Sequence, residues 1–442
     1  MDDSVTVGVL SLHNSKETKA ILNAVEALGH DGVWLREENL CVDVTDDGAT
    51  LDPDVDVIAN RLLLSNTEQP AELLGLALSL SRLRPTLNRP ENVLTAFHKF
   101  ATATAMVGSD VRLPAATLAL DSDRLNAEKE KYGDEVVYKT AIGTHGGGTW
   151  KIAADEQVNP RVGDRFAFLQ ELVERDSDRH RDLRVYVVDG DIVATMRRYA
   201  PENDWRTNVA LGGDVEGVDD LPEDAADMAL EAADVVGLDY AGVDLVEGDD
   251  GWHLLEVNPT AGFKGLFAAT GVSPAPRIAK LAIETAGGDV DDDQVASLSG
   301  VLDDSTPATT APTPRAPPEE MATIGYTEDV LVSGTSGTQR VLAKSDTGAA
   351  RTSIDTRLAA EIGAGPIKSM TKVRSGSVKS GKARPVVDIV VGVAGDRHTV
   401  AASLEDRGHM QYPLLLGRDI LQHYQVDVRR RSDADQPSES EE

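Results

Sequence analysis

Two acid-bearing segments on either side of a short turn constrain this chain more than any other feature. Ala241-Gly-Val-Asp-Leu-Val246 and Trp252-His-Leu-Leu-Glu-Val-Asn258 have the period-two pattern of strands, and Glu247-Gly-Asp-Asp-Gly251 has the composition of a hairpin turn. In such a hairpin Asp244, Glu256 and Asn258 can share one face, because side chains repeat at period two. Three oxygen donors predict a magnesium site, since Mg²⁺ takes one or two protein carboxylates beside phosphates and water.

The alternative is an acidic hairpin whose carboxylates only face solvent, which an acidic chain makes reasonable. Two observations favour the metal site. Leu254 and Leu255 bury the second strand, and the glycine-bearing turn Pro259-Thr-Ala-Gly-Phe-Lys-Gly265 follows it.

Over roughly residues 88 to 285 the chain resembles the ATP-grasp ligases, in particular the RimK-like and LysX-like branch that joins an amino acid to a carboxylate. The resemblance implies ATP as co-substrate. It also implies that Asp244, Glu256 and Asn258 hold the Mg²⁺ or Mn²⁺ ions bound to ATP.

Two lysines and a glycine run precede the hairpin. Asn88 to Phe100 is predicted to form one helix, in which the resemblance assigns Lys99 to nucleotide phosphate; the alternative is an exposed helix lysine. Lys139 ends the strand Val136-Val-Tyr-Lys139, and Gly143-Thr-His-Gly-Gly-Gly148 follows. Because a glycine run lets backbone amides approach phosphate oxygens, Gly146 and Gly147 are predicted to cover the phosphates. Alone, such a run often indicates only a flexible turn.

The buried strand Phe166-Ala-Phe-Leu-Gln-Glu171 resembles the hinge that pairs with adenine, which implicates Glu171 and Leu172. Asp182 corresponds to the ribose-region acid of the family. Asp178 is the alternative, because the insert before Asp182 is longer than the family pattern.

Three further polar residues are assigned to the reacting groups. The resemblance directs Arg184 towards substrate or phosphate. Asp204-Trp-Arg-Thr-Asn208 matches the Arg-Ser/Thr-Asn signature, so Arg206 and Asn208 are predicted to stabilise charge on the transferred phosphoryl group and the acyl phosphate. The alternative for Arg206 is an exposed loop arginine.

The formal charge of the 442-residue chain is −32, from 75 acidic and 43 basic residues. We expect this charge to repel nucleic acid and anionic membranes. Taken as spread along the whole sequence, the acidic excess predicts a halophilic archaeon. The single cysteine, Cys41, excludes an internal disulfide. No signal peptide or long apolar stretch is seen, which predicts a cytoplasmic protein.

The expected fold class is an α/β ATP-grasp fold with an N-terminal βαβ domain, followed by a small all-β retropepsin-like domain. The predicted boundaries are an N-terminal domain over 1–87, the ligase over 88–286, a disordered Pro/Thr/acidic linker over 287–322, the all-β domain over 323–430 and a disordered acidic tail over 431–442.

The last domain contains Leu342-Ala-Lys-Ser-Asp-Thr-Gly-Ala349 and, later, Leu414-Leu-Leu-Gly-Arg-Asp-Ile-Leu421. It resembles the domain called the RimK-associated ATP-dependent zinc protease, with Asp346 in a retropepsin-type loop. Zinc has no support, because His398, His409 and His423 lack H-E-x-x-H spacing. A single Asp-Thr-Gly requires a dimer for peptidase chemistry.

The resulting prediction is a carboxylate-amine ligase that adds glutamate or another amino acid to a protein C-terminus or a metabolite through an acyl phosphate. The all-β domain is either a peptidase that removes the ligated residues or a non-catalytic module for dimerisation or substrate binding. The expected assembly is at least a homodimer.

Overall fold

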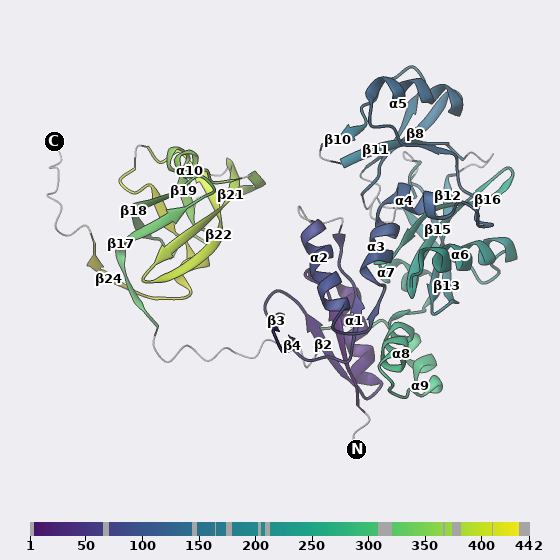
Figure 1. Cartoon of the computed structure of the whole chain (residues 1–442), viewed down its shortest axis with the longest axis horizontal. Coiled ribbons are helices and arrows are strands. Elements are labelled where there is room, and N and C mark those ends of the chain that lie inside the picture. Colours follow the sequence, from purple (N-terminus) through teal and green to yellow (C-terminus); the bar gives the residue numbers. More distant parts are fainter. Residues whose placement is uncertain are drawn as a thin grey trace. The chain divides into compact units, whose positions relative to one another are not determined.

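In the computed structural model the described residues are 4–64, 70–143, 148–163, 165–173, 179–201, 205–207, 213–307, 321–365, 367–373, 382–408 and 410–432. They form two compact units, residues 1–311 and 312–442 (Figure 1). Each unit is described by itself. Among the described residues, no helix is long and apolar enough to span a membrane.

The first unit opens with a parallel sheet of order β2-β1-β5-β6, which confirms the predicted βαβ opening. Helix α1 begins at the Ser15 cap, buries Ile21 and Val25, and is followed by Gly29 at φ 89°. The elements of this region are β1 (Thr6–Leu10), α1 (Lys16–Ala27), β2 (Asp31–Leu35), β3 (Cys41–Thr45), β4 (Gly48–Asp52), β5 (Val57–Asn60), α2 (Pro70–Ser81) and β6 (Thr86–Leu87).

The second region is a small sheet of order β10-β11-β8-β9, in which β7 also pairs with β11. It has its own apolar cluster, which includes Leu125, Val136 and Leu169. The elements are α3 (Pro90–Phe97), α4 (Lys99–Ala105), β7 (Ala116–Thr117), α5 (Ser122–Glu128), the 3₁₀ helix η2 (Lys129–Tyr132), β8 (Glu135–Thr140), β9 (Thr149–Ala153), β10 (Arg161–Val162) and β11 (Arg165–Gln170).

The single helix expected over residues 88–100 is wrong. His98 is extended, at φ −92° and ψ 95°, and its ring accepts a hydrogen bond from the Ala101 amide, so it ends α3 and caps α4. The break makes Lys99 the first residue of a new helix.

The third region is an antiparallel sheet of order β14-β13-β12-β15-β16, with α6 packed against β12, β15 and β16. One apolar core joins this sheet to the N-terminal one: Val185 and Val243 lie in the same cluster as Ile58. The elements are β12 (Arg181–Val188), β13 (Asp191–Tyr199), β14 (Asp214–Gly217), α6 (Glu223–Val236), β15 (Tyr240–Gly248), β16 (Gly251–Asn258), α7 (Lys264–Thr270), α8 (Ala275–Thr285) and α9 (Asp292–Ser299).

Helix α9 corrects the linker predicted over 287–322. Its Val295 is buried, and the helix packs on α8, so the folded unit continues beyond residue 286. Asn23 on α1 then donates hydrogen bonds to the carbonyls of Asp303, at 3.1 Å, and Ser305, at 3.0 Å. Residues 308–320 lie outside the described part of the chain.

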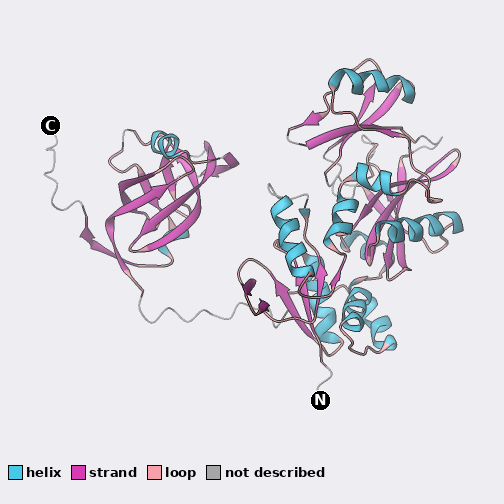
Figure 2. Cartoon of the chain, viewed as in Figure 1, coloured by secondary structure: helices cyan, strands magenta, loops and turns pink. Residues whose placement is uncertain are grey.

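The second unit consists mainly of strands around one core (Figure 2). Its sheet has the order β20-β21-β22-β19-β23-β18-β17-β24, and an additional β21–β17 pairing closes it into a barrel. The elements are β17 (Thr323–Ser333), β18 (Thr338–Ser345), β19 (Ser353–Asp355), α10 (Thr356–Ile362), β20 (Ile367–Val373), β21 (Lys382–Val393), β22 (Asp396–Glu405), β23 (Leu414–Leu416), α11 (Arg418–Leu421) and β24 (Gln425–Arg431).

The acidic excess is not spread along the whole sequence as expected. Residues 1–320 contain 59 acidic and 27 basic residues, whereas residues 321–432 contain 11 acidic and 16 basic residues. The repulsion that the net charge implies therefore belongs to the first unit.

Candidate active site

The predicted acidic hairpin forms, as β15 and β16 around the turn at Asp249 and Asp250. Asp244 lies opposite Glu256 in the register, and a register shift follows them. The Asn258 side-chain amide lies 3.3 Å from Asp244 Oδ2 and 3.1 Å from Glu256 Oε1. The three residues predicted to hold a metal therefore converge on one face.

Opposite charges alternate across this sheet, on residues that oppose one another in register. Arg184 on β12 faces Asp244 on β15 and binds it with both arms, Nε to Oδ1 and Nη2 to Oδ2, each at 2.6 Å. Asp182 on β12 faces Arg198 on β13, with bidentate contacts of 2.7 and 2.6 Å. Arg198 Nη2 also lies 3.0 Å from Asp244 Oδ2. Arg198 thus joins Asp182 to Asp244.

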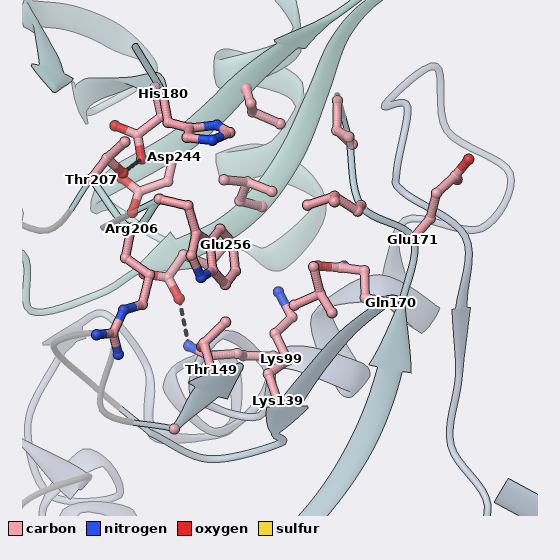
Figure 3. A pocket seen from close by; sticks show the side chains of 18 of the residues that line it. Lys99, Lys139, Thr149, Gln170, Glu171, His180, Arg206, Thr207, Asp244 and Glu256 are labelled. Carbon is pink, nitrogen blue, oxygen red and sulfur yellow. Dashed lines mark hydrogen bonds and ion pairs between the residues drawn. The ribbon is translucent and has the colours of Figure 1, made fainter. Parts of the chain in front are cut away.

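Lys99 connects Glu256 to the glycine-bearing segment that begins at Gly143. Its ammonium forms an ion pair with Glu256 and donates to the Gly143 carbonyl at 3.1 Å (Figure 3). Burial by itself raises the pKa of Glu256, but the charge and hydrogen bond of Lys99 outweigh it and hold that pKa well below its usual range. The exposed-lysine alternative fails, because the Lys99 side chain is only 13% exposed.

Lys139 extends into the same space, and no carboxylate of the described residues forms an ion pair with it. Burial, followed by the charge of Lys99, lowers the pKa of Lys139 to about 7. Burial also raises the pKa of Asp244, in spite of the two guanidinium groups beside it. A negatively charged ligand near Lys139 would favour its ammonium form.

These groups line a cavity of about 170 Å³ between the second and third sheets (Figure 3). The hinge residues Glu171 and Leu172 lie on its wall, and the Glu171 carboxylate accepts a hydrogen bond from the Ala115 amide at 3.0 Å. Other lining residues are Lys99, Lys139, Thr140, Gly143, Gly148, His180, Asp182, Arg206, Thr207, Asp244 and Glu256.

Two predicted residues are engaged by the protein itself. Arg184, expected to point towards substrate or phosphate, is clamped on Asp244 instead, because Asp244 is the acid directly opposite it in the sheet. Asp182 accepts both arms of Arg198 and the Thr207 hydroxyl. Gly146, Gly147, Asn208 and the alternative ribose acid Asp178 lie outside the described residues.

The donor set fits a magnesium or manganese ion. Asp244 and Glu256 supply carboxylate oxygens from neighbouring strands, and rotation of the Asn258 amide would bring its oxygen to the same face. Arg184 neutralises Asp244 and Lys99 neutralises Glu256, at the positions where a bound cation would neutralise these carboxylates.

In the second unit, the two motifs singled out in the sequence lie next to each other. Strand β18 leads to Asp346 and pairs with β23, and the Asp346 amide donates to the Leu416 carbonyl at 2.9 Å. Asp346 Oδ1 accepts from the Gly348 amide at 3.0 Å. Arg418 supports the loop by donating to the Thr347 and Gly348 carbonyls, at 3.0 and 3.1 Å.

No zinc site is formed by the described residues, among which no group of three or more His, Cys, Asp or Glu side chains is arranged to hold a metal. His398 stacks on His423 with ring centroids 5.1 Å apart, and its Nε2 lies 2.6 Å from the Tyr424 hydroxyl. The contacts indicate a structural role for both rings. His409 is outside the described residues.

A cavity between two sheets, with lysines on one wall and a metal-type acid set on the other, is the arrangement expected of an ATP-grasp ligase. Residues 96–282 match the RimK-like ATP-grasp domain, and residues 364–437 match a family described as the retropepsin-like aspartic endopeptidase RimB. The second match begins after Asp346.

The tetrahydromethanopterin:alpha-L-glutamate ligase of Methanocaldococcus jannaschii is 30% identical over 213 residues, which are 46% of this chain and 72% of that protein. The probable alpha-L-glutamate ligase of Thioalkalivibrio sulfidiphilus is 37% identical over 163 residues, which are 36% of this chain and 52% of that protein. The chain belongs to the RimK-like ATP-grasp family, and it also carries a RimB-like, retropepsin-like domain. It is therefore a ligase that forms amide bonds.

The fold comparison agrees with this assignment. The ATP-grasp ligase PsnB, in complex with a minimal precursor, superposes with a TM-score of 0.51 at 19% identity and covers 64% of this chain and 100% of that one. At this identity the likeness shows the fold alone.

Proposed function

We propose that this protein is an ATP-dependent carboxylate-amine ligase that adds L-glutamate, or another amino acid, to a carboxylate of a protein or small molecule through an acyl phosphate. The alternating charges around Asp244 and Glu256, facing Lys99 and Lys139 across one cavity, carry the proposal. The relatives named above support glutamate as the amine donor.

In the first step, an acceptor carboxylate oxygen attacks the γ-phosphorus of ATP, and ADP leaves. In the second, the amine attacks the acyl carbon and expels phosphate, and the amine loses a proton. Asp244, Glu256 and Asn258 would hold the metal, which when bound neutralises phosphate charge. Lys99 and Lys139 orient the phosphates, and Arg206 stabilises charge on the group in transfer. No protein nucleophile is required.

Comparison of metabolites and intact protein masses between a deletion strain and its parent would identify the acceptor. Loss of a species carrying additional glutamyl residues, about 129 Da each by composition, is the expected difference, since amide formation removes one water per residue. Identical profiles under conditions where the protein is expressed would contradict glutamate ligation.

For the all-β domain we propose an aspartic-peptidase-like activity that needs two copies of the chain, which makes the assembly at least a dimer. Asp346 is half-buried on a loop held by Arg418 and by its own contact with Gly348. One carboxylate is chemically incomplete, because this chemistry needs two acids sharing a proton. The alternative remains a non-catalytic dimerisation or substrate-binding module.

Replacing Asp346 by asparagine in the full chain is expected to abolish cleavage of a glutamyl peptide, while sedimentation still reports a dimer. Asparagine retains the oxygen that accepts from Gly348 but cannot supply the second ionisable acid. Asp329→Asn, on an exposed position of β17, is the matched control and should cleave normally. Cleavage that survives Asp346→Asn, or a monomer at working concentration, would favour the module.

From the charge distribution we also propose that this protein is cytoplasmic and adapted to high salt, as in a halophilic archaeon. Raising potassium chloride from about 0.1 M to about 1 M shortens the Debye length from about 10 Å to about 3 Å, which weakens repulsion among surface carboxylates. The melting temperature of the first unit should then rise by more than about 5 °C, the shift that roughly 2 kcal/mol gives a domain of this size. The second unit, whose residues 312–442 include 18 acidic and 17 basic residues, is an internal control and should shift less. Equal shifts, or none, would contradict the proposal.

A further inference from the structure

Arg61 is a buried cation without an acidic partner. Only 3% of its surface is exposed, and among the described residues no carboxylate lies within ion-pair distance of it. Its Nη2 reaches only the Thr260 and Ala261 carbonyls, at 3.4 and 3.3 Å, and its Nε has no hydrogen-bond partner. A buried charge is costly unless it is paired and hydrogen-bonded, so this arrangement calls for an anion.

Arg61 lies at the switch point of the N-terminal parallel sheet, where the strand order reverses. The chain passes from β1 to β2 on one side and from β5 to β6 on the other, so β1 and β5 flank the switch point of the parallel sheet. Arg61 directly follows β5, and its amide donates to the Leu10 carbonyl at the end of β1, at 2.9 Å. In open α/β sheets, the crevice beyond the carboxyl ends of such strands is the usual ligand site.

The same crevice reaches the metal-binding face of the ligase region. Arg61 and Asn258 line one small cavity, of about 10 Å³, together with Tyr186, Tyr240 and Phe263. This volume is about one water molecule. The guanidinium lies 5.1 Å from the centre of the Phe263 ring. The turn at residues 259–263 contributes Pro259, Ala261 and Phe263 to the cavity wall and begins immediately after Asn258. Because the cavity holds only about one water molecule, a carboxylate at Arg61 would have to move that turn.

The nearby side chains leave the Arg61 fork open to an anion with two oxygens, such as a carboxylate. His13 is half-buried beside Ser11, and burial, followed by the charge of Arg61, lowers its pKa. The Glu17 carboxylate is engaged by the Phe263 amide, at 3.2 Å, and by the Ser15 hydroxyl, at 2.9 Å, and forms no ion pair with Arg61. The planar Arg61 fork thus keeps its capacity for a two-oxygen ligand.

We propose that Arg61 is a carboxylate-binding subsite that holds the non-reacting carboxylate of a substrate next to the metal-binding residues. The subsite rests on the proposed ligase function for the source of its ligand, which is either the amine donor or the acceptor. A carboxylate at Arg61 replaces the long contacts to Thr260 and Ala261, and the displaced turn carries Asn258 with it.

Acetate tests the subsite without assuming any substrate. At fixed ionic strength, exchanging chloride for acetate should raise the melting temperature of the wild-type ligase unit by about 2–4 °C, because a ligand that binds only the native state stabilises it. Arg61→Met should lose this response and should be no less stable than wild type in chloride, since methionine removes an unpaired buried charge. A purely structural role for Arg61 predicts a large loss of stability in both salts.

Arg36→Met is the matched control. Arg36 also lies in the N-terminal region over an aromatic ring, Trp34, but it has an acidic partner in Glu38 at 3.5 Å. It should keep the acetate response. Arg61→Lys keeps the charge without the fork and should show a smaller response than wild type. Equal responses in wild type, Arg61→Met and Arg61→Lys, or no response in wild type, would overturn the subsite.

Calorimetry with MgADP present then identifies the source of the carboxylate. If the amine donor supplies the carboxylate, Arg61→Met should weaken L-glutamate binding at least about 10-fold. This is the effect expected from the loss of one charge-assisted hydrogen-bonded pair. Isoglutamine, which lacks the α-carboxylate, should bind wild type and variant alike, whereas glutamine should retain the difference. If the acceptor supplies it, glutamate binding stays unchanged and the KM for acceptor rises. Wild type that responds to acetate but binds no glutamate would contradict the proposed amine donor and leave the subsite standing.

Discussion

Replacing Glu256 by glutamine is expected to lower ADP release by about 100-fold or more, a loss comparable to that of a principal charge-stabilising group at other active sites. The substitution removes a metal-binding oxygen charge and the partner of Lys99, while the neutral amide occupies the same volume. Steady-state ADP release at saturating Mg²⁺ and ATP measures the effect.

Asp249→Asn provides the control, because Asp249 is an exposed acid on the turn of the same hairpin. It should turn over ATP at the wild-type rate. Both variants must show the wild-type far-ultraviolet circular dichroism spectrum at the assay temperature. Undiminished ADP release from folded Glu256→Gln would refute the metal site.

Replacing Arg198 by methionine is expected to destabilise the ligase unit by about 3–5 kcal/mol, as breaking a buried ion pair by removing one partner typically does. Arg198 and Asp182 are each only 4% exposed at their side chains, and Asp244 is 3% exposed. The substitution leaves Asp182 without both arms of its guanidinium partner. The melting temperature of the first unit reports the loss.

Arg197→Met tests whether burial, rather than loss of an arginine, is the cause. Arg197 neighbours Arg198 on β13, but its side chain is 30% exposed and its partner Glu216 lies 3.8 Å away. An exposed pair contributes about 0–1 kcal/mol, so this variant should melt near wild type. Similar melting temperatures for the two variants would show that the buried network adds little.

The sequence was most informative where short-range periodicity places residues together. Asp244, Glu256 and Asn258 belong to one hairpin, so period two and a turn sufficed to predict a common face. The βαβ opening of the N-terminal domain was also predicted, and it forms.

Contacts that depend on strand order could not be predicted so easily. Arg198 was missed as a site residue. Its partners follow from the pairing of β13 with β12 and of β12 with β15. The Asp189-Gly190 hairpin alone would place Arg197 opposite Asp182, and the register shift between Tyr186 and Val187 brings Arg198 into that position instead. The pairing of Arg184 with Asp244 depends on contact between β12 and β15, which are distant in the sequence.

Local sequence patterns also failed where the end of a helix depends on one side chain, or where a helix is stabilised by packing on a neighbouring element. The helix break at His98 depends on its ring capping α4. Helix α9 lies in an acidic segment, and its stability comes from one buried valine and from packing on α8 rather than from a broad apolar face. The nearly neutral charge of the second unit was hidden in the overall charge, which the acidic first unit dominates.

The site without nucleotide is balanced internally. Lys99 neutralises Glu256, and Arg184 and Arg198 neutralise Asp244. In the proposed reaction, binding of ATP and metal would exchange these contacts, with Lys99 passing from a carboxylate to a phosphate. The ion pairs limit the cost of holding these five charged side chains in one site.

The central claim is that this cavity transfers the γ-phosphoryl group of ATP to a carboxylate. Phosphorus NMR of the full chain with Mg²⁺, ATP, L-glutamate and the acceptor fraction would test it most directly. We predict ADP and inorganic phosphate appearing in equal amounts, in step with amide formation, and neither appearing with Glu256→Gln. AMP and pyrophosphate as the products would contradict an acyl phosphate and the account of the site built on it.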